Sequence, residues 1–262
     1  MLETRSRLSR IVLQIVVTLV VLPFAFPLVA AVQGSLRGRG WGNYKAVLEL
    51  PDLYLFFRNS LVITILILCL TYSATLMASY AFAKLRVFKR ELLFWMIMAA
   101  LTLPEVVLLA PLFATATQLG IYNTYWAVVL PAAGLQIPFL VLLSRGFVEG
   151  IPDSLFEAAW IDGAGTVKTF WYVLLPLTQP ISLAIIVLVI INSWNQYLLP
   201  LVLFQTNDRQ VVTQIAQYFQ GIYNNDETKV LAGAVIAALP MIIAYIFFQR
   251  YFERGMMAGA LK

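Results

Sequence analysis

Six long apolar runs constrain this chain more than any other feature of its sequence. A helix that crosses a bilayer needs about 20 mostly apolar residues, and each run reaches or approaches that length. Only 12% of the residues are charged, about half the share found in soluble domains. We therefore expect an all-α, polytopic membrane protein with six transmembrane helices. The predicted spans are residues 11–32, 59–83, 92–114, 125–144, 181–203 and 231–249.

The basic residues predict how these spans are oriented. The first run follows three arginines, as a signal peptide does, but its roughly 22 residues exceed the length of a signal-peptide core, so we interpret it as a retained span. Six spans put both termini on one side. With the N-terminus inside, the inner segments carry about twice as many Lys and Arg residues as the outer loops, which predicts cytoplasmic termini. The densest basic cluster, residues 84–90, is expected to be a solvated inner loop.

Several function classes are excluded by composition. The chain has no histidine and a single cysteine, Cys69, which rules out Ser-His-Asp hydrolase sites, HExxH zinc sites and disulfide frameworks. These absences argue against catalysis by this chain alone. Its net charge of +5 is the modest basic excess typical of oriented membrane proteins, so we expect no nucleic-acid partner. Without a repeat or a low-complexity linker, residues 1–262 are interpreted as one domain.

The inner loop between the fourth and fifth spans, residues 150–180, is too polar for a span and too patterned for a linker. Ser154 and Glu157 have the spacing of a capping box, which predicts the start of a short helix. Gly163 is expected to end it. Small Ala158 and Ala159 stand between bulky apolar neighbours, a pattern that suits docking into a groove on a partner.

This loop resembles the cytoplasmic EAA loop of permease subunits in ATP-binding-cassette (ABC) importers. The family pattern is EAA, three residues, Gly, nine residues, then Ile-x-Leu-Pro, and the chain departs from it only by having Val173 in place of isoleucine. The resemblance implies a type I ABC importer permease fold, with the loop docking on an ATPase. The implied ATPase-coupling residues are Glu157, Ala158, Ala159, Asp162, Gly163, Leu175 and Pro176.

The resemblance extends over most of the chain from residue 59 onward. Residues 103–113, 120–131 and 193–201 are similar to the carbohydrate-uptake branch of this family, in particular to its second permease subunit. The tail at 255–262 resembles the Gly-rich terminus of that subunit, which implies that Gly255 and Gly259 contact the ATPase.

Partners and cofactors follow from the same resemblance. It implies a heterodimer with a second permease subunit, an ABC ATPase dimer that binds ATP and Mg, an extracytoplasmic solute-binding protein, and a bacterial or archaeal inner membrane with its lipid. Residues 205–229 are polar enough to contact the binding protein. We expect no cofactor on this chain, because a phosphate-binding loop aligned on Lys168 requires glycines where Asp162 and Val167 stand.

Polar residues within the spans are candidates for the translocation pathway. Glu105 is the one acid inside the predicted spans, and charge at membrane depth usually faces a cavity or a partner. The fifth span carries amides, which can bond hydroxyl groups in both senses, and aromatic rings, which can stack on a sugar. Gln136 is a weaker candidate. The fifth-span candidates are Asn192, Trp194, Asn195, Gln196 and Tyr197.

Alternatives remain open at this point. The polar cluster could instead join helices, and Glu105 could be structural or relay protons in a secondary transporter. We expect an ABC importer permease that forms half of the pathway for a sugar or related polyhydroxylated solute. A permease for glycerol phosphate or a polyamine is the nearest alternative, and a proton-coupled secondary transporter is a more distant one.

Overall fold

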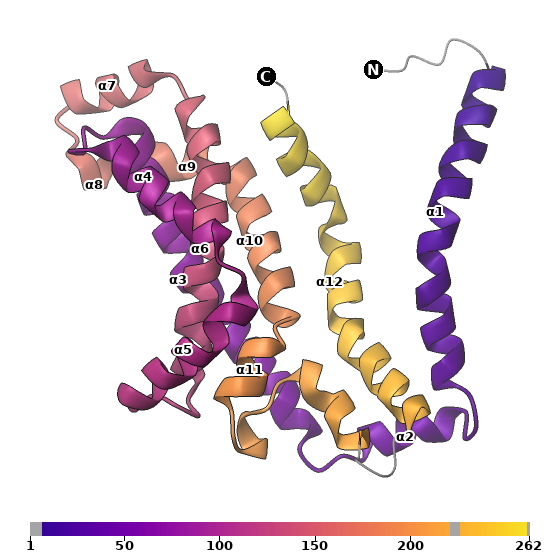
Figure 1. Ribbon diagram of the computed structural model, residues 1–262. Helices are drawn as coiled ribbons and strands as arrows, with labels where there is room; N and C mark the ends of the chain where they lie inside the picture. The colour runs from indigo at the N-terminus through magenta and orange to yellow at the C-terminus, as the bar shows by residue number, and fades with distance from the viewer. Residues whose placement is uncertain (1–6, 221–225, 261–262) are drawn as a thin grey trace. The chain divides into compact units, whose positions relative to one another are not determined.

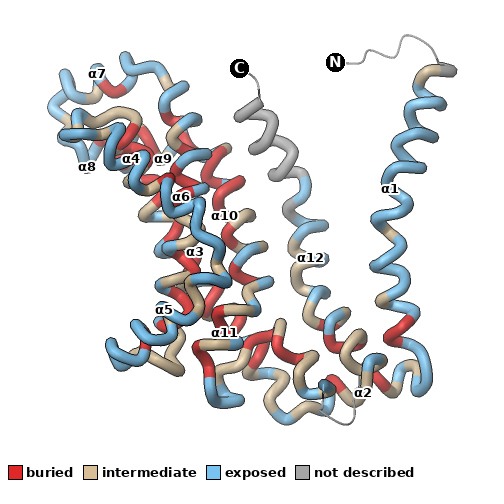
Figure 2. The backbone as a smooth tube through the Cα atoms, in the orientation of Figure 1, coloured by how far each residue is buried: buried red, intermediate tan, exposed pale blue. Residues whose placement is uncertain are grey.

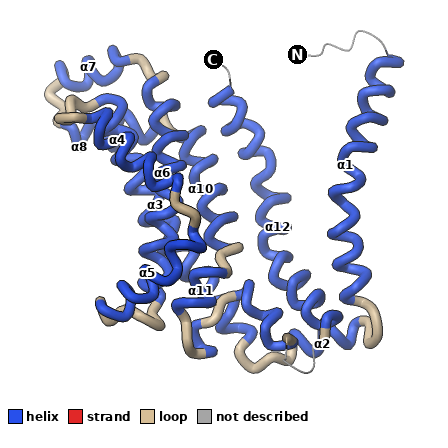
Figure 3. Tube along the Cα trace, in the orientation of Figure 1, coloured by secondary structure: helices blue, strands red, loops and turns tan. Residues whose placement is uncertain are grey.

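The chain is described by a computed structural model that covers residues 7–220 and 226–260. All regular structure within these ranges is helical (Figure 3). The principal helices are α1 (Arg7–Ser35), α2 (Trp41–Leu48), α3 (Leu53–Lys84), α4 (Arg90–Ala99), α5 (Glu105–Gln118), α6 (Tyr125–Glu149), α7 (Asp153–Ile161), α8 (Thr166–Thr169), α9 (Leu175–Leu177), α10 (Gln179–Trp194), α11 (Leu198–Leu203) and α12 (Glu227–Ala260) (Figure 1). Short 3₁₀ or π turns lie at Ala100–Thr102, Phe170–Leu174, Asn207–Arg209 and Val212–Phe219.

Four helices are individually long and apolar enough to cross a membrane, and six spans result if each of two bent helix pairs counts as one. The four are within α1, α3, α6 and α12. The third predicted span is broken between α4 and α5, where the chain bends by 102°. The pair that ends in α10 bends by 81°. The predicted span 92–114 therefore contains a sharp bend, and the predicted span 181–203 begins after the 81° bend and is interrupted at residues 195–197, between α10 and α11. The six predicted crossings agree with the structure when each bent pair counts as one span.

The described residues group into two units, one from segments within 1–53 and 215–239 and the other from 54–214 and 240–262. In the first unit, α1 approaches α12 closely: a Cβ added at Gly34 would lie 2.5 Å from the Leu231 Cδ1 atom. The apolar window of α1 has no buried residue. Its side chains are thus available to lipid or to another subunit.

The core of the second unit lies between α3, α6 and α10 (Figure 2). Its fully buried members include Ile67 from α3, Val128 from α6 and Ile185 from α10. Polar contacts join the same helices: the hydroxyl groups of Ser79 and Ser144 bond α3 to α6, and the Tyr72 hydroxyl donates to Ser182 Oγ at 3.0 Å. Such hydroxyl pairs join membrane helices because a lone polar group is costly in lipid.

One buried amide fixes the loop that follows α11. Asn59 Nδ2 donates to the carbonyl oxygens of Asp208 and Gln210, both at 2.8 Å. Its Oδ1 accepts from the Tyr125 hydroxyl at 2.6 Å. Asn59 is fully buried, so its amide ties α3 to the start of α6 and to the loop.

Replacing Asn59 by leucine is expected to lower the unfolding free energy by about 3 kcal/mol, because three partly buried hydrogen bonds lose a partner. Thermal unfolding in detergent would measure this as a lower Tm. Asn207→Ala, on the exposed surface of the same loop, is the control. Equal Tm values for the two variants would contradict the role given to Asn59.

Candidate functional site

The segment that resembles an EAA loop folds into helix α7, which lies across the end of the second unit (Figure 1). The predicted capping box does not form: the N-cap of α7 is Pro152, two residues before Ser154, and no side chain caps the N-terminus. The predicted end is confirmed. Gly163 has φ of +80°, and the N–H groups of Gly163 and Ala164 donate to the carbonyl oxygens of Trp160 and Ala159. This is the Schellman ending, in which glycine takes the left-handed position.

One aromatic side chain anchors α7 to the helices below it. Phe156 is 1% exposed, and its ring stacks on Tyr80 of α3 with centroids 6.1 Å apart. The Lys84 ammonium lies 5.2 Å from the same ring. Lys84 also donates to the Ile151 carbonyl at 2.6 Å and pairs with Asp153.

Lys84 therefore has a structural role that the sequence does not indicate. Its side chain is 5% exposed, whereas residues 84–90 were predicted to be a solvated loop. The end of α3 and the start of α7 are joined through this one ammonium group, which uses charge-assisted hydrogen bonds to a carbonyl and a carboxylate.

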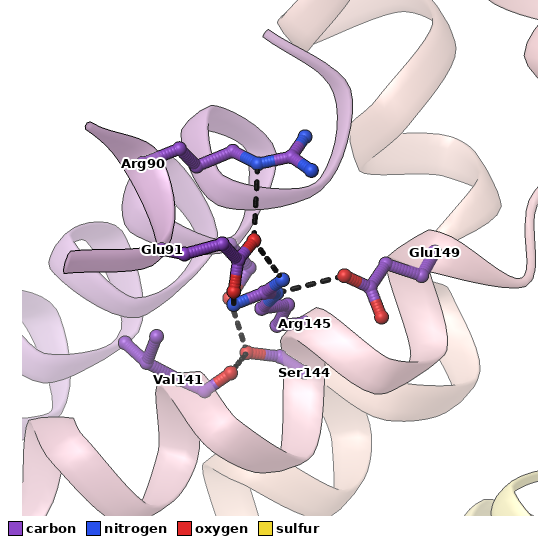
Figure 4. Close-up of polar contacts among 7 residues, drawn as sticks. Arg90, Glu91, Val141, Ser144, Arg145 and Glu149 are labelled. Atoms are coloured by element: carbon purple, nitrogen blue, oxygen red, sulfur yellow. Dashed lines mark hydrogen bonds and ion pairs between the residues drawn. The ribbon is translucent and has the colours of Figure 1, made fainter. Parts of the chain in front are cut away.

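A second set of charges joins α4 to the end of α6, the helix that leads into α7 (Figure 4). Arg145 donates to Glu91 Oε1 and to Glu149 Oε1, each at 2.7 Å. Its guanidinium lies 4.1 Å from the centroid of the Phe94 ring. The Arg145 side chain is 12% exposed, whereas those of Glu91 and Glu149 are 54% and 44% exposed, so the guanidinium group is shielded but its carboxylate partners face water. These contacts hold the C-terminal end of α6, which leads into α7, against α4.

The outward face of α7 is apolar and open. Ala158 and Ile161 lie three residues apart, opposite the anchor Phe156, as helical periodicity requires. Ile161 is 85% exposed on this face, whereas Trp160, four residues after Phe156, lies on the anchor side of α7. Figure 2 shows α7 as largely exposed apart from its anchor. A short helix that is rigidly mounted and presents isoleucine to its surroundings has the form of a docking element.

The structure brings together five of the seven predicted coupling residues. Glu157, Ala158 and Ala159 lie on α7, and Asp162 and Gly163 form its C-terminal end. Leu175 and Pro176 lie apart from them on α9, after the π turn, and line a separate cavity of about 420 Å³ with Tyr72, Gln179, Ser182 and Leu183. Helix α12 runs through Gly255 and Gly259, but the surroundings of both are outside what the structure describes.

A second feature is a cavity of about 470 Å³ that collects most of the polar candidates. Glu105 lines it from the start of α5, Gln136 from the middle of α6, and Asn192 from the end of α10. Asn195 and Gln196 complete the polar lining. Trp194 and Tyr197 do not line it. Trp194 is instead 8% exposed and faces Phe57, with ring centroids 6.4 Å apart.

Interruptions of helical structure border this cavity. Leu103 and Pro104 separate the turn after α4 from α5, and residues 195–197 separate α10 from α11. In a membrane, irregular backbone is tolerated where it is buried in protein or lines a water-filled space. Because Leu103, Asn195 and Gln196 line the cavity, this geometry is suited to a polar passage.

Sequence reasoning missed Lys84 and Phe156 as positioning residues. Lys84 resembles any topogenic lysine, and Phe156 resembles any apolar helix residue, so no local signal separates them from their neighbours. The one available signal was the spacing of Phe156 from Ala158 and Ile161, which places Phe156 on the opposite face of the helix.

Comparison with known proteins gives a consistent result. A family model described as "Binding-protein-dependent transport system inner membrane component" matches residues 74–258. The arabinooligosaccharides transport system permease protein of Halalkalibacterium halodurans is 36% identical over 79% of this chain and 74% of its own length. The trehalose/maltose transport system permease protein of Thermococcus litoralis is 33% identical over 84% of this chain and 80% of its own.

A solved structure shares the fold. The crystal structure of a bacterial ABC transporter involved in the import of the acidic polysaccharide alginate contains a chain with a TM-score of 0.79 to this one and 22% sequence identity. The match covers 96% of this chain and 99% of that chain. The likeness therefore extends over nearly the whole of both chains.

Proposed function

Because the chain belongs to the inner membrane components of binding-protein-dependent transport systems, we propose that it is the permease subunit of an ATP-driven ABC importer for sugars. It would supply half of the translocation pathway, with the other half coming from a second permease subunit. It is a transport subunit and not an enzyme. ATP and Mg would be bound by a partner ATPase dimer, and solute would be delivered by a binding protein outside the cell.

The observation that best supports this proposal is the way α7 is attached to the helices beside it. Its anchor is buried against Tyr80 and Lys84, while Ile161 on the opposite face is 85% exposed. A force applied to the open face is transmitted to α3 through Lys84 and to α6 through residues 149–153. This is what coupling to a separate ATPase requires.

Transport would proceed by alternating access. When the ATPases close on ATP, they would carry α7 with them and tilt the helices attached to it as rigid bodies. The cavity lined by Glu105 and Gln136 would then face the outside and receive the solute. We assign α7 and both chain termini to the cytoplasm, in agreement with the positive-inside rule.

Sugar as the solute is supported by the relatives that are named for arabinooligosaccharides and for trehalose and maltose. The amide-rich cavity provides the hydrogen-bonding groups that hydroxyl-rich solutes need. Competition by unlabelled sugars, glycerol phosphate and polyamines against labelled-solute uptake would separate the solute classes.

The assembled importer, reconstituted in proteoliposomes with its binding protein, would test the mechanism. We expect uptake only when ATP is enclosed with the ATPase, with no loss when a protonophore removes the proton gradient. Uptake that persists without ATP and collapses with the gradient would instead make the chain a secondary transporter and Glu105 a proton carrier.

Substitution of a cavity amide should separate solute passage from assembly. Gln136→Leu removes a polar group from the cavity lining, and we expect solute uptake to fall by about tenfold, the equivalent of one or two lost hydrogen bonds. Co-purification of the ATPase should be unchanged. The control is Gln217→Leu, which is outside the cavity lining; equal uptake by both variants would remove Gln136 from the pathway.

A further inference from the structure

Hydrogen bonds within the cavity fix which way its amides point. Gln136 Nε2 donates to the Ala132 carbonyl at 3.1 Å, and Asn192 Nδ2 donates to the Leu188 carbonyl at 3.0 Å. A backbone carbonyl can only accept, so in both amides the nitrogen must face the helix. The carbonyl oxygen of the Gln136 side chain has no partner among the described residues.

Two acceptor atoms at this cavity are buried and have no hydrogen-bond partner: Gln136 Oε1 and Glu105 Oε1. Buried polar atoms in proteins are nearly always satisfied, so such a pair calls for a ligand or water that donates. Both residues line the same cavity, but both oxygens are covered by neighbouring atoms, so an occupant of the cavity could donate to them only after a small side-chain movement.

The charge of the cavity has one sign. Among the described lining residues none is lysine or arginine, and Glu105 is the one ionisable side chain. The last turn of α10 also borders the cavity through Asn192, and the C-terminal end of a helix carries partial negative charge. The start of α5 borders the cavity as well, through Glu105, and its partial positive charge opposes that of the α10 end. The Glu105 carboxyl group is therefore the one side-chain charge that an anion would meet among the described lining residues.

We propose that this cavity selects against anionic solutes and accepts hydroxyl-rich neutral or amino sugars, with Glu105 as the residue that sets the preference. The inference rests on the proposed function, since it assumes that the cavity belongs to the pathway. Of the solutes left open above, it disfavours glycerol phosphate, whereas neutral sugars are accepted through their hydroxyl donors; it does not separate sugars from polyamines.

Thiol labelling tests this preference without knowledge of the natural solute. In the complete detergent-solubilised importer carrying Cys69→Ala, Asn195→Cys places one thiol in the cavity lining. Its rates of modification by a trimethylammonium-ethyl and by a sulfonatoethyl methanethiosulfonate are measured on this chain, each divided by the reagent's rate with a free thiol. We expect the cationic reagent to be favoured by about tenfold or more, given the neighbouring charge.

Variants of Glu105 test whether its charge causes the preference for the cationic reagent. Glu105→Gln should reduce the preference to about twofold or less, and Glu105→Asp should retain it, because only the first removes the charge. Leu119→Cys, at the far end of α5 and 66% exposed, is the matched control and should show no dependence on Glu105.

The outcomes separate the two proposals. Equal rates for both reagents, unaffected by Glu105→Gln, would overturn the charge preference and leave the pathway standing. Failure of both reagents at residue 195, with normal labelling at residue 119, would show that water does not reach the cavity and would overturn the pathway itself.

Discussion

Replacing Ile161 by aspartate is expected to abolish ATPase binding and uptake while leaving the chain folded. Ile161 is 85% exposed on the face of α7 opposite its anchor, so the permease loses almost no packing. In the docked importer the same side chain would be buried, and an unpaired charge there costs several kcal/mol, equivalent to a loss of more than about 100-fold in affinity.

The measurement is co-purification of the ATPase in mild detergent, together with uptake in proteoliposomes. Ile161→Val should retain both activities. Phe88→Asp is the matched control. Phe88 is 83% exposed on the loop at residues 84–90, and we propose no contact between it and the ATPase. Undiminished ATPase recovery with Ile161→Asp would show that the open face of α7 is not the docking surface.

The second large effect is expected for the anchor. Phe156→Ala removes a ring that is 1% exposed and packs against Tyr80 and Lys84. Core truncations of this kind cost about 3–5 kcal/mol, and here the loss falls on the attachment of α7. We expect a lower Tm, and uptake reduced more strongly than ATPase binding, because a loosely attached α7 can still dock but transmits little motion.

Two variants separate anchoring from simple instability. Phe156→Leu should restore most of the uptake, since it refills much of the space. Asn59→Leu should lower the Tm to a similar extent without uncoupling ATP hydrolysis from uptake, because Asn59 holds the loop at residues 208–210 and not α7. If Asn59→Leu also uncoupled ATP hydrolysis from uptake, coupling would depend on the overall stability of the chain and not on the Phe156 anchor.

The sequence predicts the helical class and the position of α7 well, and physical reasons explain both. Spans follow from apolar length, and Gly163 ends α7 because glycine readily adopts the left-handed conformation found there. The apolar length of residues 92–114 gives no sign that the helix breaks. Pro104 lies at that break, while Pro131 and Pro138 lie inside the continuous helix α6. Proline alone therefore does not distinguish a break from a helix that stays intact.

The candidate site is predicted only in part, because its parts meet through tertiary contacts. The structure divides the polar cluster of the fifth span: Asn192, Asn195 and Gln196 line the cavity, whereas the end of α10 directs Trp194 toward Phe57. Glu105 and Gln136 come from different helices, and no local pattern relates them. Lys84 likewise acquires its role from Ile151 and Asp153, far along the chain.

The most direct test of the whole account is purification of this chain from its native membrane in mild detergent, with cross-linking from a cysteine introduced at position 161, followed by mass spectrometry. The account predicts recovery of an ATPase with a nucleotide-binding motif, cross-linked through residue 161, together with a second EAA-bearing permease. Recovery of the chain alone or as a homo-oligomer, with no ATPase even after cross-linking, would contradict it.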